Sequence, residues 1–204
     1  IRILDVIKML EETGIAALAL HARTRSQMYK GEARWEWLRR IKDESNMSIP
    51  LIGNGDATTP EKIEAMFEKT GVDAVMVGRG AIGNPWIFRD VKIYRETGEL
   101  PPPPSWNERC EVIAEHLALK CEWLGEKTGV LEMRRMYGGY FKGFRGASRL
   151  RHLIMGESSL DGVLEVLLNF SEEDAKTKIP VADVRAVAVA ASLPTATRKR
   201  AQSV

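Results

Sequence analysis

Short apolar runs alternate with amphipathic segments along the first hundred residues. Leu4–Glu12 has apolar residues at helical spacing and is followed by Thr13-Gly14, which predicts a helix that a glycine ends. Ile15–Leu20 is a continuous apolar run, as expected of a strand buried on both faces. A polar loop follows, and a helix is expected around Trp35–Lys42. This order predicts one strand–helix unit of a parallel sheet.

The pattern occurs twice more. Ile49–Gly53 and Ala74–Val77 are further predicted strands, and helices are expected at about 60–69 and 84–95, the first opened by Thr59-Pro60. The predicted strand starts, near residues 15, 49 and 74, are separated by about 34 and about 25 residues, close to the ~31 residues per unit of an eight-stranded α/β barrel. Three units cannot close a barrel. The predicted fold class is therefore α/β, with residues 1–97 as a partial TIM barrel made of its last three βα units.

A second domain is expected after a proline-rich linker at residues 98–104. Ser105-x-x-Glu108 forms a capping box that opens a new helix. All the periodic segments from there to residue 170 are helical: Trp106–Glu126, Leu131–Phe144, Ala147–Met155 and Leu160–Leu168. Residues 105–170 are thus predicted to form an all-helical domain. Residues 171–204 lack a clear core pattern and are expected to be a tail that is poorly ordered toward its end.

Composition narrows the class of protein. The apolar stretches are far shorter than the roughly 20 residues of a membrane span, so no membrane association is expected. Cys110 and Cys121 lie in one predicted helix about 16 Å apart, too far to bridge, and are interpreted as reduced packing residues of a cytoplasmic protein without a metal site. The chain opens inside an amphipathic helix without an initiator methionine, which suggests a piece of something longer.

The net charge of +2 is too small to indicate a polyanionic partner, but its distribution is uneven. Between Leu131 and His152 a single acid, Glu132, stands against six basic residues: Arg134, Arg135, Lys142, Arg145, Arg149 and Arg151. Such a surplus favours a phosphate-rich partner, because each contact releases condensed counterions. The charge pattern alone fits a solvated basic helix face equally well.

Two polar motifs follow successive predicted strands. Asn54-Gly55-Asp56 comes after the second strand and Gly78-Arg79-Gly80 after the third. Glycines let the backbone approach a phosphate closely and Arg79 adds a charged donor, whereas Asn54 and Asp56 suit the hydroxyls of a sugar or ribityl chain. Each motif alone is a common turn. Together, at neighbouring strand ends of a barrel, they favour a phosphate-bearing ligand.

The first predicted strand ends in His21-Ala22-Arg23-Thr24-Arg25. A histidine at a strand end is more often structural than catalytic, but this one lies at the functional rim of the predicted barrel. It could hydrogen-bond a flavin ring or a base, and Arg23 and Arg25 are expected to contact an RNA backbone or base.

Three segments in this order, HARTRSQMYKGEARW, IPLIGNGD and DAVMVGRGAIGNPWIF, resemble the tRNA-dihydrouridine synthase family, in its bacterial B-type branch. The later EMRRMYGGYFKGFRGASRLR is similar to the family's C-terminal helical domain. The resemblance covers about residues 1–170.

The resemblance implies a flavin, FMN, at the mouth of the barrel, with NADPH as the reductant that reduces it. Its cofactor-binding residues would be His21, Asn54, Gly55, Asp56, Gly78 and Arg79. The family reduces the C5–C6 double bond of a uridine in tRNA, so tRNA is the implied partner. It would be bound by the loop that contains Arg23-Thr24-Arg25 and by the helical domain. The chain is expected to act as a monomer.

The chain departs from the family by carrying only the last part of the barrel, without the family's catalytic cysteine; Cys110 and Cys121 lie in the helical domain. Little synthase activity and weak FMN affinity are therefore expected of this chain alone. Two alternatives stay open: another FMN barrel oxidoreductase acting on a small metabolite, and a non-catalytic RNA-binding fragment.

Overall fold

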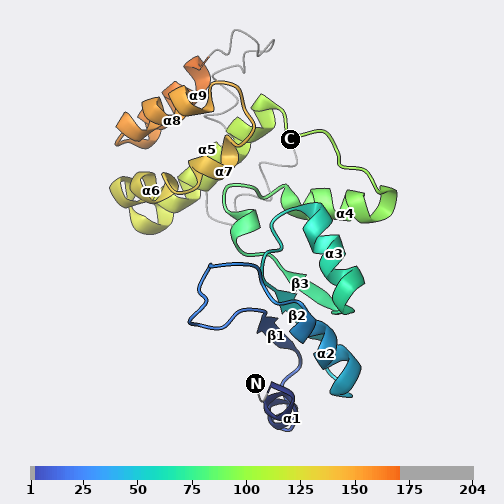
Figure 1. Ribbon diagram of the computed structural model, residues 1–204. Coiled ribbons are helices and arrows are strands. Elements are labelled where there is room, and N and C mark those ends of the chain that lie inside the picture. Colours follow the sequence, from blue (N-terminus) through green and yellow to red (C-terminus); the bar gives the residue numbers. More distant parts are fainter. Residues whose placement is uncertain (1–2, 171–204) are drawn as a thin grey trace, which may run out of the picture. The chain divides into compact units, whose positions relative to one another are not determined.

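The computed structural model describes residues 3–170, and the predicted tail at 171–204 lies outside the described residues. The chain divides into two compact units, residues 1–102 and residues 103–204, with the boundary inside the proline run at 101–104. Unit 1 is an α/β structure and the described part of unit 2 is helical (Figure 1).

Unit 1 contains three parallel strands in the order β1-β2-β3, formed by Leu18–His21, Leu51–Asn54 and Ala74–Met76. Helix α1 precedes the sheet, α2 and α3 connect its strands, and a short 3-10 turn, η1, leads to α4. Their bounds are Ile3–Glu11, Glu36–Glu44, Pro60–Thr70, Arg79–Ala81 and Ile87–Thr97, respectively. Strands β1 and β2 begin three and two residues later than the apolar runs of the sequence, because their ladder starts where the Leu18 N–H bonds the Pro50 carbonyl, whereas β3 begins at Ala74 as predicted.

The two faces of the sheet differ in what they contact. Leu18, Leu20 and Leu51 alternate toward the helices and join the core that includes Leu38 and Met66. Gly53 lets β2 lie close against α3, since a Cβ there would lie 2.8 Å from the Met66 sulfur. The opposite face carries aligned rows, Ala19–Ile52–Ala74 and His21–Asn54–Met76, of which Ala19, His21 and Met76 are exposed. Helices thus pack on one face of this parallel sheet.

Local signals explain the ends of α3. The Thr59 side chain accepts a bond from the Lys62 N–H and Pro60 occupies the first turn, where its missing N–H costs nothing. Gly71 ends the helix at a positive φ of 68°. This helix therefore follows the sequence prediction closely.

Unit 2 contains five helices among residues 105–170: α5 Trp106–Leu124, α6 Glu126–Met133, α7 Tyr137–Tyr140, α8 Ala147–Gly156 and α9 Leu160–Asn169. Ser105 and Glu108 form the predicted capping box. Helix α6 folds back on α5 so closely that a Cβ on Gly129 would lie 2.7 Å from the Cys121 Cα. The buried Arg109 side chain donates to the carbonyls of Pro104 and Tyr140, which ties the start of α5 to α7.

One helix prediction is wrong. A continuous helix over Leu131–Phe144 was expected, but α6 already begins at Glu126 and ends at Met133, and only the short α7 follows. The helical path is interrupted at residues 134–136, where the Arg134 N–H bonds the Leu131 carbonyl and the Met136 N–H bonds the Met133 carbonyl. These three-residue spacings are tighter than those of an α-helix. Gly143, at a φ of 73°, turns the chain before Phe144.

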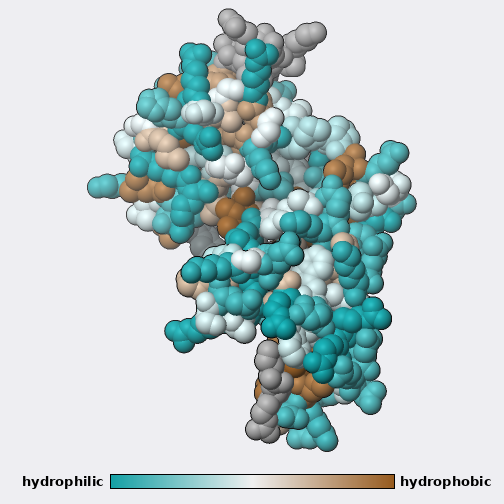
Figure 2. All heavy atoms as spheres, in the orientation of Figure 1, coloured by the Kyte–Doolittle hydropathy of each residue, from teal (hydrophilic) through white to brown (hydrophobic). Residues whose placement is uncertain are grey.

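The surface carries scattered apolar residues. Figure 2 shows a mostly hydrophilic face with separate hydrophobic spots, and large exposed apolar side chains include Trp123, Met28 and Phe88. Within residues 3–170, none of the helices has the length and apolar character that crossing a bilayer requires. Nor do three metal-binding side chains (His, Cys, Asp or Glu) cluster there.

The capping box of α5 predicts a loss of stability in one variant. S105A should lower the free energy of unfolding of the helical unit by about 1 kcal/mol, because the Glu108 N–H loses its acceptor. Urea unfolding followed by circular dichroism measures the change. S148A, which alters an exposed serine within α8, is the matched control and should change stability by less than about 0.5 kcal/mol. Equal effects of the two variants would contradict this role of Ser105.

Candidate functional site

The carboxyl ends of the three strands meet at one edge of the sheet. His21, Asn54 and Met76 are aligned there in register. A depression of about 110 Å³ opens at this edge, lined by His21, Tyr29, Asn54, Gly55, Asp56, Ala57, Thr58, Met76, Gly78 and Arg79. The structure therefore brings the two predicted motifs and the predicted histidine to one place.

Asp56 is the centre of the polar contacts at this edge. Its Oδ2 accepts from Arg23 Nη2 at 2.5 Å and from the Ala33 N–H at 2.8 Å, and its Oδ1 accepts from Arg79 Nη2 at 2.9 Å. The residue has a positive φ of 59°, which an aspartate tolerates better than most residues. Two guanidinium groups against one carboxylate leave a net positive charge at the depression. The arrangement favours an anionic ligand.

The pKa of the Asp56 carboxyl is lowered from its ordinary value of 3.8. Burial is the largest single influence and raises it, but the Ala33 N–H, Arg23 and Arg79 together outweigh burial. Asp56 is therefore a carboxylate at neutral pH, held by its partners rather than open to solvent.

Other contacts fix the two turns. The Asn54 side-chain amide donates to the Met76 carbonyl at 2.8 Å and thereby links β2 to β3. The Trp35 ring N–H donates to the Gly55 carbonyl at 2.9 Å, and His21 Nδ1 lies 3.3 Å from the Asn54 carbonyl. Gly55 has a φ of 126°, and a Cβ there would lie 2.8 Å from that of Ala33. A side chain at this position is thus excluded both by conformation and by space.

The two glycines beside Arg79 have different surroundings. A Cβ on Gly80 would lie 2.9 Å from the Thr58 Cα, so this glycine lets β3's turn pack on the turn after β2. A Cβ on Gly78 would meet nothing within 4 Å. Gly78 therefore leaves an open approach to the backbone beside the Arg79 guanidinium.

Tyr29 and Ala33 belong to the site although the sequence reasoning did not assign them. The Arg79 guanidinium carbon lies 4.3 Å from the centre of the Tyr29 ring, a cation–π contact, and Ala33 supplies a backbone donor to Asp56. The Ala33 contact could not be predicted, because a backbone N–H donor leaves no signal in the sequence. The position of Tyr29 in the loop after His21 was a signal that it could reach the site, but nothing in the spacing indicated its contact with Arg79.

Arg23 and Arg25 were predicted as RNA contacts, and the structure places them differently. The Arg23 side chain is only 3% exposed and is bound to Asp56, whereas Arg25 is exposed to solvent. Arg23 faces inward because its guanidinium reaches the Asp56 carboxylate on the neighbouring turn. Of the pair, only Arg25 is exposed.

The six basic residues between Leu131 and His152 also differ in position. Arg134 donates to the carbonyls of Met155 and Glu157, at the end of α8, and the exposed Arg135 pairs with Glu132. The other four, Lys142, Arg145, Arg149 and Arg151, are also exposed, on the α7–α8 connection and on α8.

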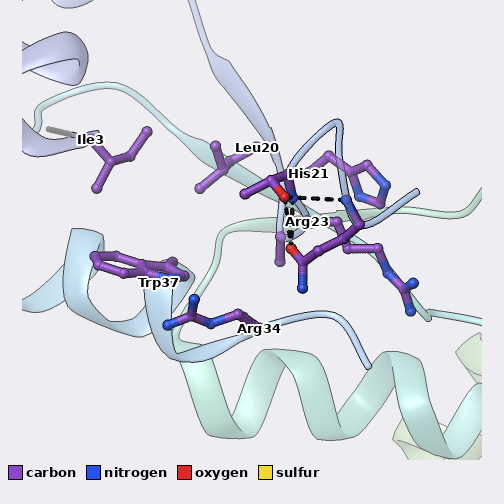
Figure 3. A pocket seen from close by; sticks show the side chains of 9 residues that line it. Ile3, Leu20, His21, Arg23, Arg34 and Trp37 are labelled. Atoms are coloured by element: carbon purple, nitrogen blue, oxygen red, sulfur yellow. Dashed lines mark hydrogen bonds between the residues drawn. The ribbon is translucent and has the colours of Figure 1, made fainter. Parts of the chain in front are cut away.

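A second cavity of about 120 Å³ lies beside the end of β1. Figure 3 shows Ile3 and Leu20 on one side of it and Trp37 and Arg34 on the other. Arg23 lines this cavity, and His21 lines both this cavity and the depression at the strand ends.

The lowered pKa of Asp56 predicts a pH dependence of stability. A depressed carboxyl pKa stabilises the fold above the unfolded value of about 3.8 and loses this contribution as the pH falls through the folded-state pKa, which is lower. The difference in unfolding free energy between the wild type and D56N should therefore be constant from about pH 7 to about pH 5 and shrink below about pH 3.8. Chemical unfolding at a series of pH values measures it.

The control for this series is D43N, which removes an exposed carboxylate of α2 that pairs with Arg39. This variant should stay close to the wild type at every pH, since exposed ion pairs contribute little. A D56N difference that persists undiminished well below pH 3.8 would count against the Asp56 contacts.

Comparison with known proteins identifies the chain's relatives. The family model described as dihydrouridine synthase (Dus) matches residues 1–179. The tRNA-dihydrouridine synthase B of Pseudomonas putida is 43% identical over 148 residues, which cover 72% of this chain and 43% of the relative. That of Shewanella oneidensis is 43% identical over 136 residues, 67% of this chain and 42% of the relative.

A longer match, to the tRNA-dihydrouridine synthase B of Pasteurella multocida, is 33% identical over 181 residues, 85% of this chain and 54% of the relative. The chain thus spans about half the length of the curated relatives it matches. Since the family match extends over both units, we conclude that this chain belongs to the dihydrouridine synthase family.

Proposed function

We propose that this chain forms the phosphate-binding side of an FMN site and part of the RNA-binding surface of a tRNA-dihydrouridine synthase. The reaction is the reduction of the C5–C6 double bond of a uridine in tRNA, with NADPH as the source of electrons. The observation that carries the proposal is the convergence of His21, Asn54–Asp56 and Gly78-Arg79 on one depression with a net positive charge.

The depression suits the phosphate end of FMN. Arg79 is 46% exposed on its side chain and can turn one edge of its guanidinium to a phosphate while the other stays near Asp56. The open backbone at Gly78 allows the phosphate to come close. The Asn54 amide, at the base of the depression, is a suitable partner for ribityl hydroxyls. Asp56 acts here mainly by holding Arg79.

The sheet supports the partial-barrel interpretation of unit 1. Parallel sheets are normally covered on both faces, and here helices pack on one face while the other carries exposed Ala19, His21 and Met76. In a closed barrel that second face points inward. The depression then lies at the barrel's carboxyl-terminal mouth, where α/β barrels bind their ligands.

The bound flavin supplies the hydride that reduces the uridine. His21, the last residue of β1, lines the depression. There it can donate a hydrogen bond to the flavin ring or to the uracil. Because a uracil within a helix is covered by its neighbours, the target base must leave its stack to reach this edge. The exposed Arg25 is placed to contact the RNA backbone around it.

Neither cysteine of the chain fits the role of a proton donor to uracil. Both lie on α5 as free thiols, Cys110 buried and Cys121 half-buried with its Sγ 3.8 Å from the Glu126 carbonyl. Burial raises the pKa of both thiols. We therefore expect little synthase activity from this chain alone, although it retains residues for both ligands.

The exposed cations of the α7–α8 connection and α8 are proposed to contact tRNA phosphates. Arg134 is only partly exposed, and the charge of Arg135 is balanced by Glu132, so both contribute less to such a surface. Lys142, Arg145, Arg149 and Arg151 are exposed and lie in a stretch, residues 142–151, whose sequence has no acidic residue, which makes them the better candidates.

A flavin titration tests the phosphate site. The wild type should bind FMN more tightly than riboflavin, which has the same ring and ribityl chain but no phosphate. R79Q should lower FMN affinity roughly 10- to 100-fold, the loss of one charged hydrogen bond, and leave riboflavin affinity nearly unchanged. Quenching of flavin fluorescence measures both. A wild type that does not distinguish the two ligands would overturn the phosphate assignment.

The salt dependence of tRNA binding tests the basic surface. In a plot of log affinity against log salt concentration, the R149Q/R151Q double variant should lower the slope by about 2, because each phosphate contact contributes about 0.9. R40Q, which alters an arginine of α2 paired with Glu44, should leave the slope unchanged. If the double variant also keeps the wild-type slope, these arginines make no phosphate contacts.

A further inference from the structure

The loop at residues 24–33 has few anchors of its own. Its side chains are mostly exposed, and its internal bonds are local, such as those from Thr24 to the Gln27 side chain. Yet this loop carries Tyr29, which lines the depression and stacks on Arg79. Something outside the loop must hold it there.

Arg23 supplies that anchor. Its Nη2 donates to the Gly31 carbonyl at 2.8 Å and to the Asp56 carboxylate at 2.5 Å, so one nitrogen connects the end of the loop to the turn after β2. Its Nη1 lies 3.4 Å from the Met28 carbonyl and 3.5 Å from that of Lys30. One guanidinium thus contacts three loop carbonyls and a carboxylate, which a lysine ammonium cannot match in geometry.

The contacts close a ring around the depression. Arg23 holds Asp56, Asp56 holds Arg79, and Arg79 stacks on Tyr29, which belongs to the loop that Arg23 holds. The Ala33 N–H bonds the same Asp56 oxygen as Arg23, so both ends of the loop depend on this carboxylate. Loosening Arg23 therefore affects both the loop and the orientation of Arg79.

We propose that Arg23 is a positioning residue that holds the 24–33 loop against the phosphate-binding turn and sets the orientation of Arg79, without itself contacting RNA or flavin. Its effect on the loop follows from the contacts above; its effect on flavin affinity rests on the proposed function. The assignment differs from the RNA contact expected from the sequence, because a side chain 3% exposed has no surface to offer a phosphate.

Hydrogen–deuterium exchange of the unliganded chain tests the first effect. In R23Q, amides of residues 24–33 should exchange roughly tenfold faster, while those of α3 keep their wild-type rates. In R23K, which keeps the charge but not the forked geometry, the loop amides should exchange at rates between those of the wild type and R23Q. R25Q, two residues along with an exposed side chain, is the matched control and should match the wild type.

Two results would overturn the proposal. One is a loop that exchanges at the wild-type rate in R23Q. The other is exchange that becomes faster in α3 and in the loop to the same extent, in both R23K and R23Q. Such a result would mean that Arg23 stabilises the fold as a whole and not the loop in particular.

A double-variant cycle with FMN tests the second effect. R23Q alone should weaken FMN binding several-fold, and in a D56N background it should cause a smaller further loss, because part of the effect of Arg23 on Arg79 passes through Asp56. Independent losses that multiply would contradict this route. If the wild type binds no FMN, the proposed function fails, while the exchange result still decides whether Arg23 holds the loop.

Discussion

The Asp56 carboxylate, at the turn after β2, binds two guanidinium groups and a backbone N–H that come from different segments of unit 1. Without it, Arg23 would be a buried cation lacking its counter-charge, and such a group is costly in a protein interior. Among the contacts within residues 3–170, Arg79 would keep that with the Tyr29 ring. Three features depend on this one ion-pair network: the position of Arg79, the candidate phosphate-binding residue, the shape of the 24–33 loop, and the net charge of the depression.

Much of the fold could be predicted because its signals are local. Thr59, Pro60 and Gly71 mark both ends of α3, and Ser105 with Glu108 marks the start of α5. The failed prediction was also one of local conformation: apolar residues from Leu131 onward recur at helical spacing, but the chain turns at residues 134–136 and again at Gly143. Hydrophobic periodicity shows which residues can be buried, and it does not show where the backbone turns.

The candidate site was predictable in part. Parallel strands bring their carboxyl ends to one edge, so the positions of Asn54 and Arg79 in the sequence were enough to place them together. The direction of a side chain within that edge was not predictable. Arg23 and Arg25 are two residues apart in the segment after His21, yet one turns inward to a carboxylate 33 residues away and the other faces solvent. That choice depends on a tertiary partner, which no pattern in the loop reveals.

The central claim is that the turns after β2 and β3 bind a single phosphate group. Amide chemical shifts recorded while FMN is added to the labelled chain test it most directly. The largest shifts are expected at Gly55, Asp56, Gly78 and Arg79, with a smaller response when riboflavin replaces FMN. Shifts confined to other parts of the chain, or equal responses to both ligands at these four residues, would contradict it.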